Sequence, residues 1–131
     1  MGLRTVLGAV ALGLILVPRV ARSQEASKPG LQLGAEEYEG WRQYSVHCAR
    51  CHGQDVLGNP VAADLLVTTA PGGSSAEPEV FAGIVKAGRP ARGMPTLGPG
   101  LTDEQIAAIY AYVRGRAEQR IPPGRPRGPS S

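Results

Sequence analysis

The sequence predicts an all-α fold, with three main helices in one domain. Apolar residues recur every three or four positions in residues 35–51, in residues 78–88 and in residues 102–115. That spacing is typical of helices that bury one face. Stretches rich in glycine and proline separate the three segments and predict loops. A length of 131 residues is sufficient for one small globular domain with a modest core.

The first and last helices have clear start signals. Glutamates open residues 35–51, where they suit the positive end of the helix dipole, and Trp41 shares the apolar face, so we expect it in the core. Thr102 and Gln105 have the spacing of a capping box, and Gly115 is placed to end the last helix. The apolar face of this helix comprises Ile106, Ile109, Tyr110 and Val113.

Residues 1–23 predict a cleaved secretory signal peptide. Arg4 precedes an apolar run over residues 6–17, and the small-x-small site Ala21-Arg22-Ser23 follows. The twelve residues of that run span about 18 Å as a helix, which is shorter than the roughly 30 Å core of a bilayer. We therefore expect an exported, periplasmic protein with no transmembrane span after cleavage.

Composition divides the rest of the chain. Residues 24–34 predict a flexible leader, residues 35–120 the folded domain, and residues 121–131 a tail rich in proline, glycine and arginine. Cleavage after Ser23 removes three of the 14 basic residues, so the remaining chain has eleven basic and 11 acidic residues.

The chain lacks the clustered basic face with stacking aromatics that nucleic-acid binding needs. We expect no nucleic-acid partner.

The segment Cys48-Ala49-Arg50-Cys51-His52 carries the chemistry of the chain. C-x-x-C-H is the attachment motif of c-type haem, in which two thiols bond the vinyl groups and the adjacent imidazole meets the iron. Met94 lies well downstream in a Gly/Pro-rich loop, from which it could approach the opposite face of the haem. The sequence thus predicts one covalently attached haem c.

Three other interpretations of the cysteines compete with haem. Exported proteins often form disulfides, C-x-x-C is also the thioredoxin-like redox motif, and two thiols could form half of a zinc site with His47. A thioredoxin-like site expects a parallel-sheet pattern, and zinc needs about four ligands. A helix turns His47 about 100° away from its neighbour, so we expect this imidazole at the surface.

The motif, the loop Gly93-Met94-Pro95 and the flanking helices resemble class I cytochromes c over residues 36–115. The resemblance implies a class I cytochrome c-like fold in which residues 35–120 form the cytochrome c domain around the haem. In that family the helix before the motif crosses the C-terminal helix. Gly40, with Tyr44 facing Tyr110, is similar to that contact.

The same resemblance implies the iron ligands, with His52 proximal and Met94 distal. The residues that bind haem would be Cys48, Cys51, His52 and Met94. Methionine ligation implies a raised reduction potential. Many relatives fix the proximal imidazole with a proline carbonyl, for which Pro60 is the candidate here. Three arginines could face a haem propionate or a docking partner: Arg50, Arg89 and Arg92.

A narrower resemblance is to the small periplasmic cytochromes associated with quinoprotein alcohol dehydrogenases. It rests on Gly40-Trp41, residues 47–55, Gly88-Arg89-Pro90 and Gly124-Arg125-Pro126. It implies an electron carrier, not an enzyme, that takes single electrons from a dehydrogenase containing pyrroloquinoline quinone (PQQ) and passes them to a terminal oxidase or another cytochrome. The alternatives are a haem subunit of a periplasmic redox enzyme complex, for example in sulfur oxidation, and a haem-based sensor.

Overall fold

The chain is described here by a computed structural model that covers residues 1–2 and 31–130. Nearly all of the predicted signal peptide and most of the predicted leader lie outside these residues. The helices are α1 (Ala35–His47), α2 (Ala49–His52), α3 (Leu65–Thr68), α4 (Pro78–Ala87) and α5 (Asp103–Ala117). The described part contains no strand, and the all-α prediction is confirmed. None of the helices in this part has the length and apolarity needed to cross a bilayer.

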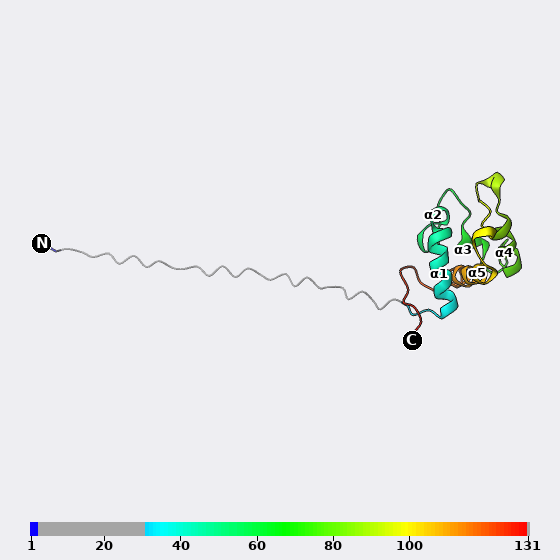
Figure 1. Cartoon of the computed structure of the whole chain (residues 1–131). Coiled ribbons are helices and arrows are strands. Elements are labelled where there is room, and N and C mark those ends of the chain that lie inside the picture. Colours follow the sequence, from blue (N-terminus) through cyan, green and yellow to red (C-terminus); the bar gives the residue numbers. More distant parts are fainter. Residues whose placement is uncertain (3–30, 131) are drawn as a thin grey trace.

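The most extensive helix pair is α1 with α5, and the two helices cross in the middle of the domain (Figure 1). Gly40 permits the close approach, because a Cβ atom built there would overlap the Ala108 carbonyl oxygen and lie 2.9 Å from Tyr112 Cβ. One turn further along α1, Tyr44 packs on Tyr112 with the ring centroids 5.5 Å apart. A glycine and two tyrosines therefore set the geometry of the crossing.

The predicted pairing of Tyr44 with Tyr110 is wrong. Two residues along an α-helix are about 200° apart, so Tyr110 leaves the α1 side of α5 when Tyr112 faces it. Tyr110 instead packs on Phe81 of α4, with ring centroids 5.4 Å apart, and its hydroxyl donates to the Ala76 carbonyl oxygen. Figure 1 shows the result, with α5 between α1 and α4.

Several helix boundaries follow their predicted signals and two do not. Pro78 opens α4, Gly88 caps its end, and Thr102 and Gln105 form the predicted capping box of α5. The first helix, however, breaks at Cys48 instead of continuing through the motif. The last helix runs past Gly115, because this glycine serves packing: its Cβ position lies 2.6 Å from Ile121 Cδ1.

One apolar cluster forms the core. Trp41, predicted to belong to the core, is partly buried against this cluster and stacks on Tyr38. The buried members come from all three main helices and from the segments before, between and after them, which makes the domain a single packing unit. They are Leu33, Tyr44, Val56, Phe81, Val85, Leu101, Ile106, Ile109, Tyr112, Val113 and Ile121.

Residues 121–128, which we call the C-terminal strap, run as a curved segment without helix beside the start of α1 (Figure 1). The Leu33 N–H donates to the Arg127 carbonyl oxygen at 3.1 Å. The Arg125 guanidinium lies over the Trp41 ring, 5.8 Å from its centroid, which is within the range of a cation–π contact. The strap is therefore fastened both to the backbone ahead of α1 and to an aromatic side chain of α1.

We expect Gly40→Ala to destabilise the haem-containing protein by about 1–3 kcal/mol, because the added methyl must displace the backbone of α5. Gly83→Ala is the matched control. Gly83 also lies inside a helix, α4, but nothing lies within 4 Å of its Cβ position. Helix propensity should make that variant more stable by up to about 1 kcal/mol. Urea unfolding measures both, and equal stabilities would contradict the role given to Gly40.

Candidate haem-binding site

Helix α2 is a single turn that carries the C-x-x-C-H motif. Cys48 is both the last cap of α1 and the first cap of α2. Its carbonyl oxygen accepts the N–H of Cys51 at 3.1 Å and the N–H of His52 at 2.9 Å. Residues three apart in such a turn share a face, so both cysteines project from the same side of α2. Both are free thiols, as haem attachment requires and a disulfide does not allow.

The two thiols differ in their surroundings. Cys48 packs against the core cluster, and burial, together with the neighbouring Cys51 thiol, raises the pKa of Cys48 to about 12. Cys51 is exposed. A thioredoxin-like pair depends on a thiol whose pKa is lowered, and Cys48 has the opposite environment.

The structure also gives no support for a zinc site at the two cysteines. The described residues hold no group of three or more histidine, cysteine or carboxylate side chains that could bind a metal.

His52 is held by a backbone carbonyl. Its Nδ1 atom lies 2.9 Å from the carbonyl oxygen of Ala63. Because a carbonyl oxygen only accepts, Nδ1 must carry the proton and donate it. In the neutral imidazole, the Nε2 atom then has a free lone pair, which is the state that a metal ligand needs. The predicted acceptor, Pro60, is wrong, and Ala63 takes its place. Every residue carries such a carbonyl, so no side-chain signal could have identified this acceptor.

The residue after His52 has to be glycine. Gly53 has a φ of +87°, and a Cβ atom built on it would overlap the carbonyl oxygen of Gly58. The Tyr44 hydroxyl donates to the Gly53 carbonyl oxygen at 2.7 Å. Burial, and secondarily the neighbouring Cys48, raise the pKa of Tyr44 well above its usual range, so this hydroxyl keeps its proton. The sequence placed Tyr44 at the helix crossing but did not indicate this second contact.

A strained turn, which we call the haem turn, begins two residues after Gly53 and consists of Asp55 and Val56. Asp55 and Val56 have φ values of +54° and +60°, and Val56 is completely buried. Left-handed backbone costs a residue other than glycine about 1–2 kcal/mol, and it is a pronounced outlier for a β-branched side chain. Arg116 Nε donates to the Asp55 carbonyl oxygen at 2.8 Å, and the Gly124 N–H donates to Asp55 Oδ2 at 3.0 Å. Sequence analysis missed these partners, which are 61 and 69 residues away.

Met94 comes from a closed loop between α4 and α5. Its N–H donates to the Arg89 carbonyl oxygen at 3.2 Å, and the Arg89 N–H donates to the Met94 carbonyl oxygen at 2.9 Å. The Leu97 N–H donates to the Val85 carbonyl oxygen at 3.2 Å, which fixes the loop to α4. Met94 is half-buried and packs against the same core cluster as Cys48. Cys48 and Met94, two predicted haem-binding residues from distant segments, therefore border one core.

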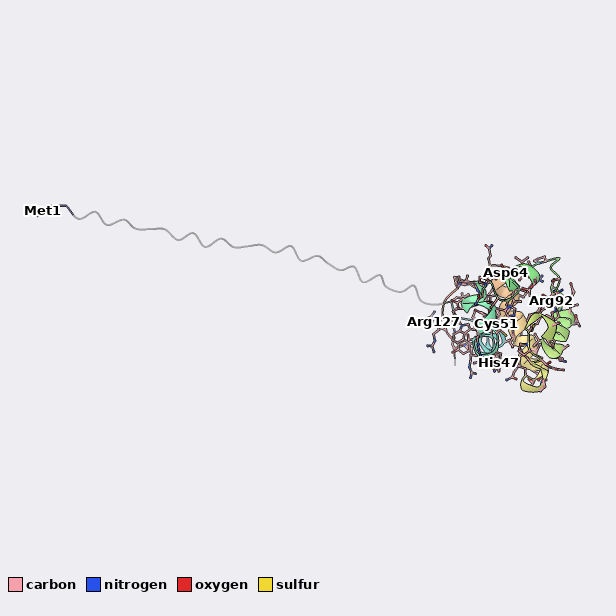
Figure 2. The ribbon with its side chains drawn as sticks, turned by 90° about the horizontal axis from the view of Figure 1, so that it is seen from above. Met1, His47, Cys51, Asp64, Arg92 and Arg127 are labelled. Carbon is pink, nitrogen blue, oxygen red and sulfur yellow. The ribbon has the colours of Figure 1, made fainter. Side chains whose placement is uncertain are left out.

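The histidine and arginine residues that flank the haem motif and Met94 in the sequence are exposed to solvent. His47 is exposed, as predicted, and so are Arg50, Arg89 and Arg92. Figure 2 shows Cys51 on the α1–α2 side of the domain and Arg92 on the loop beside α4. Arg89 and Arg92 line a hollow of about 420 Å³. A larger hollow of about 540 Å³ lies against α4 and α5, and none of the motif residues lines it.

The donor set of α2 fits haem c. Two free thiols three residues apart and an imidazole with Nε2 available are the groups that a covalent haem needs. An all-α domain that presents them on one turn, next to two crossing helices, has the architecture of a c-type cytochrome. The chain belongs to the family described as cytochrome C oxidase, cbb3-type, subunit III, which it matches over residues 35–113.

Two relatives agree with this assignment. The fold is similar to that of the c-type cytochrome XoxG from Methylobacterium extorquens AM1, with a TM-score of 0.66 and 26% identity over 78% of this chain and 64% of that one. Quinohemoprotein alcohol dehydrogenase ADH-IIG from Pseudomonas putida is 31% identical over 87 residues, which are 66% of this chain. The chain spans only 11% of the length of that dehydrogenase.

The comparisons confirm the predicted class of protein. The chain is a c-type cytochrome with a class I cytochrome c-like all-α fold, its cofactor is covalently bound haem c, and electron transfer is the function of this class of domain. The predicted resemblance to cytochromes associated with quinoprotein alcohol dehydrogenases is likewise confirmed by the similarity to the dehydrogenase from Pseudomonas putida.

Gly53→Ala should lower the unfolding free energy of the haem-containing protein more than Gly72→Ala does. Both glycines have positive φ values, +87° and +79°, so alanine at either position adopts a strained backbone. Only at position 53 does the new methyl also meet another residue, the carbonyl of Gly58. We expect about 1 kcal/mol or more for Gly72→Ala and a further 1–3 kcal/mol, roughly, for Gly53→Ala. Denaturant titration of both variants gives the difference, and equal losses would contradict the steric argument.

Proposed function

We propose that this chain is a periplasmic electron carrier whose haem is bonded to Cys48 and Cys51, with His52 and Met94 as the iron ligands. The observation that carries the proposal is the hydrogen bond from His52 Nδ1 to the Ala63 carbonyl oxygen. It fixes the tautomer and orientation of the imidazole and makes Nε2 a better donor. Histidines that serve as metal ligands are typically held in this way.

Met94 is the proposed second ligand. The other methionine of the chain, Met1, belongs to the predicted signal peptide. The paired backbones of Arg89 and Met94 present the thioether at the border of the core, where it is half-buried. Haem supplies reversible one-electron chemistry at its iron, and a thioether ligand favours the reduced state. With His52 and Met94 both as ligands, the iron would have no position left for a substrate.

The proposed electron donor is a PQQ-dependent alcohol dehydrogenase, and the proposed acceptor is a terminal oxidase or another cytochrome. The identity of 31% with a quinohemoprotein alcohol dehydrogenase supports the donor. The signal peptide predicted in residues 1–23 supports a periplasmic location. A second candidate function is that of a haem subunit in a larger redox complex. The family description, which names an oxidase subunit, favours this alternative.

Replacing Met94 by alanine tests the ligand set. The reduced wild-type protein should show sharp α and β bands, and the oxidised protein should show the weak far-red band of sulfur ligation. Met94→Ala should abolish the far-red band, allow the iron to bind added imidazole, and lower the potential by on the order of 0.1 V, since axial ligands spread haem potentials over about 0.8 V. Spectroelectrochemistry measures all three properties.

Thr96→Ala is the matched control for this loop. The Thr96 hydroxyl donates to the Ala87 carbonyl oxygen at 3.2 Å, so the variant loosens the loop without removing the thioether. It should keep the far-red band. A wild-type protein that has haem but lacks this band would refute Met94 as a ligand and favour an open-site sensor or subunit. A protein without haem would refute the whole proposal.

The donor can be tested directly with a PQQ-dependent alcohol dehydrogenase and an alcohol. The oxidised cytochrome should develop its reduced α band in stopped-flow mixing, whereas a dehydrogenase that uses a nicotinamide cofactor should leave it oxidised. If exposed arginines guide docking, raising the ionic strength from about 0.01 M to 0.15 M should slow the reaction, because the screening length falls from about 30 Å to 8 Å. A cytochrome that ascorbate reduces but the quinoprotein does not would contradict the proposed donor.

A further inference from the structure

Arg116 is a buried arginine of α5, with 6% of its surface exposed. Two of its hydrogen-bond acceptors are backbone carbonyls from different parts of the chain. Nε donates to the Asp55 carbonyl oxygen at 2.8 Å, and Nη1 donates to the Ile121 carbonyl oxygen. One guanidinium therefore ties α5 both to the segment that follows the haem motif and to the first residue of the C-terminal strap.

The strap holds the same segment from a second direction. The Gly124 N–H donates to Asp55 Oδ2 at 3.0 Å, so backbone and side chain of Asp55 are both fixed. These restraints act where the backbone is unfavourable, because Asp55 and Val56 are both left-handed. A conformation of this kind persists only when its surroundings enforce it, and it relaxes when they are removed.

This turn lies between the two partners of the imidazole hydrogen bond. His52 precedes it by three residues, and Ala63, whose carbonyl accepts from Nδ1, follows it by seven residues. The course of the chain between these residues decides whether the carbonyl reaches the ring. On the His52 side, the Tyr44 hydroxyl fixes Gly53. On the far side, Arg116 and the strap fix Asp55.

We infer that Arg116 is a positioning residue for the proximal haem ligand: through Asp55 it holds the turn from which the chain runs on to Ala63, whose carbonyl oxygen accepts from the His52 ring. Arg116 does not touch the imidazole itself. It acts on the hydrogen bond that orients the ring, and it couples that bond to the C-terminal strap through Ile121. The inference rests on the proposed role of His52 as an iron ligand.

The test is the exchange rate of the His52 Nδ1 proton in the reduced, haem-containing protein, followed by NMR. Arg116→Gln should speed up exchange by about tenfold or more, since the turn opens when a bond from a charged donor is lost. Arg114→Gln is the matched control on the same helix. Arg114 also donates to backbone carbonyls, but to those of Thr69 and Ala76, which lie outside the haem turn. It should leave the His52 proton unchanged.

Asp55→Ala provides a second route to the same result if Arg116→Gln yields no folded protein. This variant removes the acceptor of the Gly124 N–H but keeps the backbone carbonyl that Arg116 uses. It should speed up exchange by a smaller factor. Unchanged exchange in the variants at Arg116 and Asp55, or equal acceleration in Arg114→Gln, would overturn the inference alone. A wild-type protein in which His52 does not ligate the iron would overturn the proposed function and this inference with it.

Discussion

The close approach of α1 and α5 at Gly40 is the constraint on which the rest of this structure depends. It exists because no side chain separates the two backbones, and it brings Tyr44 against Tyr112. From that position the hydroxyl of Tyr44 donates to the carbonyl oxygen of Gly53, the residue that follows the haem motif in the sequence. The same orientation of α5 directs Arg116 to Asp55 and Tyr110 to Phe81 of α4. A packing constraint between two helices thus becomes a set of restraints on the haem turn.

The site itself is assembled mainly from backbone groups. The Cys48 carbonyl closes the turn of α2, the Ala63 carbonyl orients His52, and the Met94 loop is closed by its own main chain. Side chains contribute by fixing this backbone, as Tyr44 and Arg116 do. Such an arrangement would pre-organise the imidazole for its proposed role as an iron ligand, and preorganisation reduces the rearrangement that accompanies a change of charge at the iron.

The features that sequence reasoning identified are those in which the identity of a side chain is itself the signal. C-x-x-C-H, Pro78 at the start of α4 and the Thr102–Gln105 capping box belong to this group. Errors arose where the outcome depends on distant partners. Tyr110 and Tyr112 are two aromatic residues on opposite sides of α5, and which one meets α1 depends on how α5 is rotated about its own axis. Gly115 looked like a helix end, but it makes room for Ile121 of the strap.

The strap has a geometric consequence for how this domain can be connected to other proteins. Leu33, just ahead of α1, is hydrogen-bonded to Arg127, so the chain enters and leaves the domain at adjacent points. Domains whose ends lie side by side tolerate insertion into a host polypeptide, because neither connection distorts the fold. The same cytochrome unit can therefore be joined to an enzyme through either end or placed within one of its loops, with the haem turn left intact.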